Sequence, residues 1–253
     1  MPKTLRDYYL SYHGVEELSF TMLHGNHLAT FEKLAGRGKG NYPGLIHQSV
    51  RDLLNAKFVV SNQPLPPQFF PADMYRQLRS FGNAVIYENL SALPRAFPVY
   101  DYKVIPDENK ILAALTDTSF DYKSCIILEE TPEIQPSEIS DSLTSIVVPA
   151  RVYDIENGSF RVDVEMLADG FLFLSENYYP AWKAYENNQQ LATLKANLTF
   201  RAISLNKGHH TVICKYENET YNMAFAVSEF TFIFLVLSLI GLIIKDKYIK
   251  QKE

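Results

Sequence analysis

The stretch Phe171–Tyr216, FLFLSENYYPAWKAYENNQQLATLKANLTFRAISLNKGHHTVICKY, decides the fold. It alternates short runs of aromatic and β-branched residues with turn residues, notably Asn187-Asn188 and Gly208. Short strands separated by turn signals at a spacing of about ten residues are typical of an antiparallel β-sandwich. We therefore predict a sheet-rich domain that leads directly into the apolar segment after residue 220.

The segment immediately before this stretch extends the pattern. Ser159–Met166 alternates apolar with charged residues, as a strand with one buried face does. Asp169 and Gly170 follow it, and an Asp-Gly pair between two strands supplies the positive φ angles of a tight hairpin. We predict a hairpin that joins Ser159–Met166 to the strand beginning at Phe171.

The N-terminal half has a mixed pattern. Within Gly44–Val60, apolar residues first follow helical spacing and then form a β-branched run, which predicts a short helix leading into a strand at 56–60. Ser61–Pro71 contains four prolines and is predicted to be a surface connector, because each proline removes a ladder donor. Asn83–Glu88 is a further predicted strand.

A second helix and strand follow. Ser91–Tyr102 is predicted to be extended, interrupted by two prolines. Glu108–Leu115 has helical spacing with Asp107 as its N-cap, and Ser124–Leu128 is predicted to be a buried strand, so this part resembles an α/β unit. The acidic, proline-containing run from Glu129 to Leu143 is predicted to be an exposed linker.

Together these patterns predict an α+β fold that is mainly β, with a small α/β lobe, an antiparallel β-sandwich and one C-terminal transmembrane helix. The predicted boundaries are 1–128 for the mixed α/β lobe, 129–149 for the acidic linker, 150–220 for the β-sandwich, 221–245 for the transmembrane helix and 246–253 for a basic cytoplasmic tail.

The transmembrane prediction rests on Met223–Ile244, MAFAVSEFTFIFLVLSLIGLII. At about 1.5 Å rise per residue this segment matches the ~30 Å hydrocarbon core of a bilayer. Four lysines follow it, at positions 245, 247, 250 and 252, whereas Glu217 and Glu219 precede it. By the positive-inside rule, residues 1–220 are predicted to be extracytoplasmic and the C-terminus cytoplasmic, with the lipid bilayer as the first partner.

The N-terminal residues, MPKTLRDYYLSYHGVEELSF, do not have the basic and apolar regions of a secretory signal. Two hypotheses account for this. In one, the chain is a tail-anchored protein with its domain in the cytoplasm. In the other, which the lysines favour, it is the C-terminal piece of a longer polytopic protein, or it works with an upstream polytopic membrane partner.

Composition and motifs exclude several functions. A net charge of −5 and a pI near 5.7 are unlike a nucleic-acid-binding surface, which needs clustered Lys and Arg. Cys125 and Cys214 lie in apolar runs and are predicted to be buried free thiols, with a disulfide as the alternative. His24 and His27 invite a metal hypothesis, but no third ligand stands in register, so neither a metal site nor a cofactor is predicted.

The segment Leu174–Glu217 resembles the C-terminal extracytoplasmic module of the YfhO-like bacterial membrane proteins, which are similar to C-fold (GT-C) glycosyltransferases. Three upstream segments appear in the family's order, RDLLNAKFVV (Arg51–Val60), VIYENLSALPRAFPVY (Val85–Tyr100) and ILAALTDTSFDYKSCIILEE (Ile111–Glu130). The resemblance covers about residues 45–244. It departs from the family pattern at Ala181, where glycine is usual, and at Asn187-Asn188, where an Asp-Gly-like turn is usual.

The resemblance implies a membrane-anchored domain that is accessory to transfer of a polyprenyl-phosphate-linked sugar to a cell-envelope acceptor. In that family the catalytic acid lies in an early external loop that these residues do not contain. No catalytic residue is therefore assigned, and enzyme activity of this chain stays an open question. The alternative is a stand-alone single-pass carbohydrate-binding or scaffolding protein without enzyme activity.

Aromatic and amide side chains supply the candidate glycan-binding residues. Aromatic faces stack on sugar rings and amides bond to hydroxyls. The candidates are Tyr178, Tyr179, Trp182, Tyr185, Asn187 and Asn188. The alternative is that Trp182 fills the sandwich core and the tyrosines cover its rim.

Overall fold

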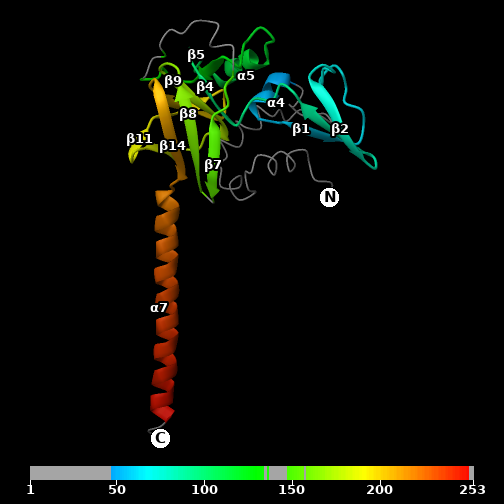
Figure 1. Ribbon diagram of the computed structural model, residues 1–253. Coiled ribbons are helices and arrows are strands. Elements are labelled where there is room, and N and C mark those ends of the chain that lie inside the picture. Colours follow the sequence, from blue (N-terminus) through cyan, green and yellow to red (C-terminus); the bar gives the residue numbers. More distant parts are fainter. Residues whose placement is uncertain (1–46, 134–135, 137–146, 157, 251–253) are drawn as a thin grey trace. The chain divides into compact units, whose positions relative to one another are not determined.

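The computed structural model describes residues 47–133, 136, 147–156 and 158–250. The chain divides into two compact units, one ending at Lys215 and the other beginning at Tyr216. The first holds the sheets and the second is a single helix (Figure 1). The predicted mainly β fold with a C-terminal apolar helix is confirmed.

A six-stranded sheet forms the centre of the first unit. Its strands, in spatial order, are β4 (Ala96–Val99), β9 (Gly170–Asn177), β13 (Phe200–Leu205), β12 (Thr193–Ala196), β6 (Cys125–Leu128) and β5 (Asp101–Val104). Strands β9 and β13 are buried along nearly their whole length, as FLFLS and FRAISL require. A strand without alternation is buried on both faces, so this sheet must be covered on both sides.

One face of this sheet is covered by a second sheet. The five-stranded sheet contains, in spatial order, β11 (Gln189–Leu191), β10 (Trp182–Glu186), β14 (Gly208–Tyr216), β8 (Ser159–Met166) and β7 (Arg151–Glu156). Every second residue of β8 is buried, which confirms the period-two prediction. Leu172 and Leu174 of β9 share a core with Val162 and Val212 of this sheet.

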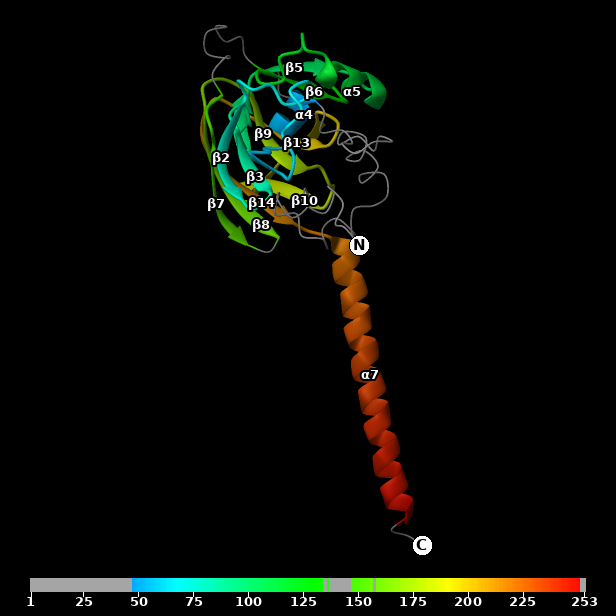
Figure 2. The ribbon, with the colours of Figure 1, turned by 90° about the vertical axis from the view of Figure 1, so that its right-hand side faces the viewer.

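Two helices cover the opposite face. Helix α4 (Gln48–Leu53) and helix α5 (Glu108–Thr116) bury Val50, Leu53, Ile111 and Leu115 in one core with Phe173. The Asp107 carboxylate accepts a hydrogen bond from the Lys110 backbone N–H at 2.9 Å, which confirms Asp107 as the N-cap. Strands β5 and β6 are parallel with α5 between them in sequence, so the predicted α/β unit is present (Figure 2).

A smaller sheet completes the first unit. It contains β1 (Phe58–Ser61), β3 (Ala84–Asn89) and β2 (Tyr75–Phe81), in that spatial order and antiparallel throughout. The predicted strands near 56–60 and 83–88 correspond to β1 and β3. Strand β2 was not predicted. No strand or helix lies between β1 and β2, which agrees with the proline-rich connector.

The second unit is helix α7 (Glu219–Lys250). Its segment Met223–Leu242 is long and apolar enough to cross a membrane, and none of it is buried within the structure. A core helix of a soluble protein would bury one face, so the exposure of the whole segment supports membrane anchoring.

The predicted hairpin at Asp169-Gly170 is wrong. Strand β8 belongs to the five-stranded sheet and β9 to the six-stranded sheet, so this connection crosses from one sheet to the other. Gly170 does not have a positive φ. Glycine is needed there because a Cβ atom would lie 2.8 Å from both Tyr100 Cδ1 and the Val99 carbonyl oxygen.

The predicted boundary between an α/β lobe and a sandwich does not separate the sheets. Strands β4, β5 and β6, from the predicted lobe, lie in the same sheet as β9, β12 and β13. Most of the predicted linker lies outside the described residues, as do His24 and His27.

Candidate functional site

The two ends of the sandwich differ in chemistry, and strand register fixes which residues lie at each. Cys214 pairs with Phe160, while Gly208 pairs with Met166 at the other end of the same ladder. In the facing sheet, Phe200 pairs with Asn177 and Leu205 with Gly170. We name the end at Cys214 and Phe160 the Trp182 end, because Trp182 packs on Phe160 with ring centroids 5.7 Å apart. The end at Gly208 and Met166 is the His210 end.

The Trp182 end carries an ionic cluster between the two sheets. Arg95 donates from Nε to Glu176 Oε1 at 2.6 Å, and its Nη2 lies 2.6 Å from the same oxygen. Arg201 Nη2 lies 3.8 Å from Glu176 Oε2. The Arg201 guanidinium carbon is 4.9 Å from the Trp182 ring centroid, so the cluster joins an ion pair to an aromatic face.

The members of this cluster differ in burial. The Arg201 side chain is 3% exposed, whereas the Arg95 and Glu176 side chains are 33% and 13% exposed. Burial lowers the pKa of Arg201, and Cys214 and Glu176 act in the opposite direction. Two arginines on one carboxylate leave excess positive charge, and the solvent-accessible part of that charge is on Arg95.

Three of the candidate glycan-binding residues lie at this end. Tyr178 and Tyr179 are half-buried in the connection between β9 and β10, and Trp182 opens β10. The Tyr178 backbone N–H donates to the Thr199 carbonyl at 2.6 Å, and that of Trp182 to the Tyr179 carbonyl at 2.9 Å. Burial raises the pKa of the Tyr178 hydroxyl, so this side chain stays a neutral donor and acceptor at physiological pH.

The side chains of Tyr179 and Trp182 point in different directions. Tyr179 packs against the core beneath the helices, whereas Trp182 packs against the core between the two sheets. This geometry therefore agrees with the interpretation of Trp182 as a core residue, whereas Tyr179, which was interpreted as a rim residue, also packs against a core. Tyr178 is the candidate of the three that neither core includes.

The other three candidates lie elsewhere. Tyr185 projects from the face of β10 opposite to Trp182, because the two differ by an odd number of residues. Asn187 and Asn188 form the turn between β10 and β11, with φ angles of 48° and 64°. The pair occupies the two positive-φ positions of a type I′-like turn, which asparagine tolerates well. The structure thus does not bring the six candidates together on one surface.

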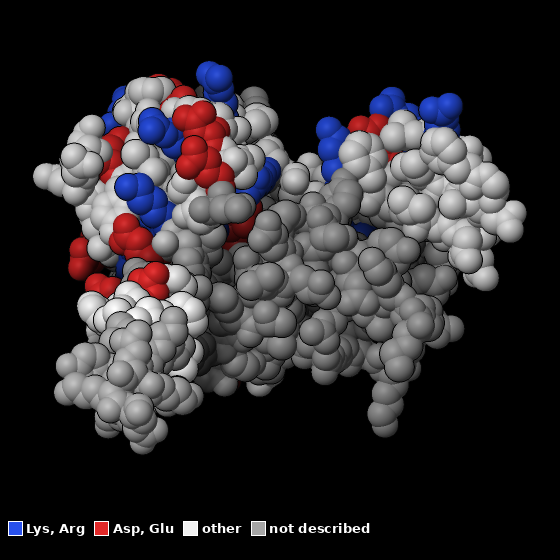
Figure 3. Space-filling model, turned by 90° about the horizontal axis from the view of Figure 1, so that it is seen from below, with Lys and Arg blue, Asp and Glu red and all other residues white. Residues whose placement is uncertain are grey.

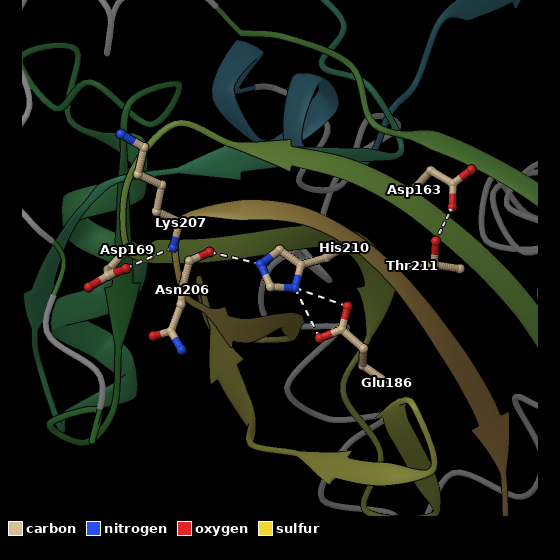
Figure 4. A network of polar contacts seen from close by, with 7 residues as sticks. All are labelled: Asp163, Asp169, Glu186, Asn206, Lys207, His210 and Thr211. Carbon is tan, nitrogen blue, oxygen red and sulfur yellow. Dashed lines mark hydrogen bonds and ion pairs between the residues drawn. The ribbon is translucent and has the colours of Figure 1, made fainter.

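The His210 end has its own polar network (Figure 4). His210 Nδ1 lies 3.0 Å from both carboxylate oxygens of Glu186, and its Nε2 lies 2.9 Å from the Asn206 carbonyl oxygen. Both ring nitrogens therefore face acceptors. Each polar group in this contact has a partner, so the contact holds β10 and β14 together and has a structural role.

Further along β14, Asp163 accepts hydrogen bonds from Thr211 at 2.9 Å and from Tyr153 at 3.0 Å. These contacts tie β14 to β8 and β7 on the outer face of the five-stranded sheet, and Figure 4 shows the one between Thr211 and Asp163.

A third polar network surrounds α4. The buried Asp52 carboxylate accepts four hydrogen bonds at 2.7 to 3.0 Å, from Gln48, Asn89, Ser91 and Tyr122. The buried neighbour Arg51 donates to Tyr75 at 2.7 Å and stacks 4.4 Å from the Phe70 ring centroid. The pKa of Tyr122 is raised by burial and by the Asp52 charge. This network fastens the three-stranded sheet to α4.

Cys125 and Cys214 are free and buried, as predicted. Burial raises the pKa of the Cys125 thiol to about 12 and that of Cys214 to about 11. A nucleophilic or metal-binding cysteine needs a thiolate. Among the described residues, no group of three His, Cys, Asp or Glu side chains is arranged to hold a metal ion.

Sequence reasoning missed Arg95, Glu176 and Arg201. The available signal was Arg201, the one charged residue within the largely apolar run FRAISL. A charge in a fully buried strand requires a partner, but the identity of that partner depends on strand pairing.

Comparison of this chain with protein-family models, with curated proteins and with solved structures found no match.

Proposed function

We propose that this chain is a membrane-anchored extracytoplasmic domain that contacts lipid-linked sugar at the Trp182 end of its sandwich. In this role it is accessory to a YfhO-like, GT-C-type glycosyltransferase, and the catalytic core lies in an upstream part or partner. The sugar is carried on a polyprenyl phosphate and passes to a cell-envelope acceptor.

The observation that carries the proposal is the position of β14. This strand runs from the His210 end to the Trp182 end, where it finishes at Tyr216. Only Glu217 and Asn218 separate it from α7. Tyr178, Trp182 and the arginine cluster therefore lie at the end of the sandwich from which the chain continues into α7.

The chemistry at this end suits a sugar on a phosphate. Aromatic faces and phenolic hydroxyls are common in carbohydrate sites. Arg95 and Glu176, which are partly exposed, offer a planar donor and a planar acceptor for vicinal hydroxyls. The excess positive charge of the two arginines favours an anionic carrier over a neutral one.

The single tryptophan provides a direct test. The full chain, in phospholipid nanodiscs, is titrated with a polyprenyl-phosphate-linked hexose and, in parallel, with the polyprenyl phosphate alone and with the free hexose. Trp182 fluorescence reports binding. We expect a saturable change with the lipid-linked sugar, weakened by Tyr178→Ala and by Glu176→Gln.

Tyr185→Ala is the matched control, because Tyr185 is an aromatic residue of the same region on the opposite face of β10. It should bind as the unmodified chain does. Equal loss in the Tyr178 and Tyr185 variants, or no response to the lipid-linked sugar, contradicts the proposal. A response to free hexose alone favours the stand-alone carbohydrate-binding alternative.

A further inference from the structure

The three-stranded sheet has one face turned toward α4 and one face turned away. Tyr75 and Asn89 belong to the first, since they form a cross-strand pair and both bond to residues of α4. The residues that alternate with them along the strands point to the other face, which we call the outer face. Strand register places the following residues on it: Phe58, Val60, Arg76, Arg79, Phe81, Ala84, Ile86 and Glu88.

The outer face carries several exposed apolar side chains. The exposed fractions are 66% for Val60, 54% for Phe81 and 40% for Phe58. These residues come from both edge strands, β1 and β2, so the apolar surface extends across the width of the sheet. Isolated exposed apolar residues need no explanation, but several on one sheet face indicate a surface that contacts something apolar.

The charges on this face are cationic on balance. Arg76 pairs with Glu88 at 2.5 Å, while Arg79 stacks 4.9 Å from the Phe81 ring centroid and has no carboxylate partner among the described residues. On the rest of the surface that Figure 3 shows for the described residues, Lys and Arg side chains lie close to Asp and Glu side chains.

We propose that the outer face of the three-stranded sheet lies against the lipid bilayer that α7 crosses. Aromatic and aliphatic side chains would occupy the headgroup region, and Arg79 would extend toward lipid phosphates. This combination is typical of surfaces that lie in a membrane interface. The inference goes beyond the proposed function and requires only that α7 spans a membrane.

A bilayer fits this surface better than a second copy of the chain. In a two-fold dimer the same surface faces itself, so the net positive charge of this face would meet an identical positively charged face. Anionic headgroups attract the same positive charge. The apolar segment Met223–Leu242, which is long and apolar enough to cross a membrane, is consistent with a bilayer next to the domain.

Adjacent residues on β2 provide a matched test. Phe81 and Ser80 are both exposed, but they lie on opposite faces of the sheet. The full chain with Phe81→Cys or Ser80→Cys is labelled with an environment-sensitive fluorophore. The native Cys125 and Cys214 are buried and stay unlabelled. Each protein is then placed in nanodiscs of zwitterionic or partly anionic lipid.

We expect the label at position 81 to shift to shorter emission wavelength and to be quenched by nitroxide-bearing lipid, more strongly with anionic lipid. The label at position 80 should respond to a water-soluble quencher instead. Arg79→Glu should reduce lipid quenching at position 81 in anionic nanodiscs. Circular dichroism verifies that each variant is folded.

Two results overturn the proposal. One is equal access of the water-soluble quencher to positions 80 and 81. The other is a shift at position 81 that occurs only in nanodiscs loaded with two chains, because that result assigns the face to a second copy.

Discussion

At the scale of single residues, the closest packing constraint is at Gly170. Its missing Cβ leaves room for the Tyr100 ring and the Val99 carbonyl, both 2.8 Å from the position that a Cβ would occupy. The Tyr100 hydroxyl is held in place because it accepts a hydrogen bond from the Leu167 backbone at 2.9 Å. The ring therefore cannot move aside without breaking a second contact.

We expect Gly170→Ala to lower the free energy of unfolding by about 1–3 kcal/mol, the usual cost of an added group in a packed site. Urea unfolding of the full chain in micelles, followed by Trp182 fluorescence, measures this. Gly82→Asn is the control, because Gly82 has a φ of +55° and open space around it, and asparagine tolerates that conformation. A Gly170 variant as stable as the control would contradict the packing argument.

The two buried thiols give a prediction about pH. Burial raises the pKa of Cys214 to about 11 and that of Cys125 to about 12, and only the thiolate reacts with alkylating agents. Deprotonation is the unfavourable step, so reactivity should rise about tenfold for each pH unit up to pH 9.

At pH 8 we expect the folded chain to react with iodoacetamide at least about 100-fold more slowly than a free cysteine of ordinary pKa. The urea-unfolded chain should be alkylated at both positions. Mass spectrometry of the time course distinguishes the two cysteines. Rapid labelling of either thiol in the folded chain at pH 8 would show that it is accessible and ionised.

At the scale of the elements, the Asp52 network holds α4 against the three-stranded sheet. Its carboxylate has four donors and no solvent exposure. Removing a buried charge from such a network leaves several donors without a partner, which costs more than the loss of one hydrogen bond.

We expect Asp52→Ala to lower the free energy of unfolding by roughly 3 kcal/mol or more, and Tyr122→Phe by about 1 kcal/mol. Asp163→Ala is the matched control, since its carboxylate accepts two hydrogen bonds on the outer face of a sheet. Urea unfolding of the three variants measures the differences. If Asp52→Ala costs no more than Asp163→Ala, α4 is not anchored through this carboxylate.

The elements that the sequence predicted are those with a local signal. The alternation in Ser159–Met166 sets the buried face of β8, and Asp107 caps α5 because its side chain reaches a backbone N–H three residues away. Strand β4 lies within the predicted extended run Ser91–Tyr102, although Pro98 interrupts its pattern. The proline is tolerated because β4 is the edge strand of its sheet.

Sheet membership was not predictable from local pattern. Alternation shows which face of a strand is buried, but it does not show which strand lies beside it, so β8 and β9 were wrongly joined as a hairpin. The same limit applies to the site. Tyr178 and Trp182 were found because their side-chain chemistry is local, whereas the contact of Arg201 with Glu176 depends on the pairing of β13 with β9 and on its irregularity at Phe200 and Arg201.

At the scale of the whole molecule, the charges that flank the apolar segment predict the orientation of the chain. Lysines at 245, 247, 250 and 252 follow the segment, and two glutamates precede it. Cytoplasmic flanks of membrane helices carry the excess of Lys and Arg. The proposed function requires the same orientation, because its sugar carrier is met outside the cytoplasm.

Two introduced cysteines, tested separately, decide this orientation in intact bacterial cells that make the full chain. Gln190 is exposed on β11, and Lys250 ends α7 beyond the apolar segment. We expect a membrane-impermeant maleimide that reaches the periplasmic side to label Gln190→Cys before lysis and Lys250→Cys only after it. The maleimide does not label the native thiols of the folded chain, because both are buried. The reverse pattern would establish a tail-anchored protein with a cytoplasmic sandwich. It would also remove the lipid-linked sugar from reach of the Trp182 end, even if the outer face of the three-stranded sheet still met a bilayer.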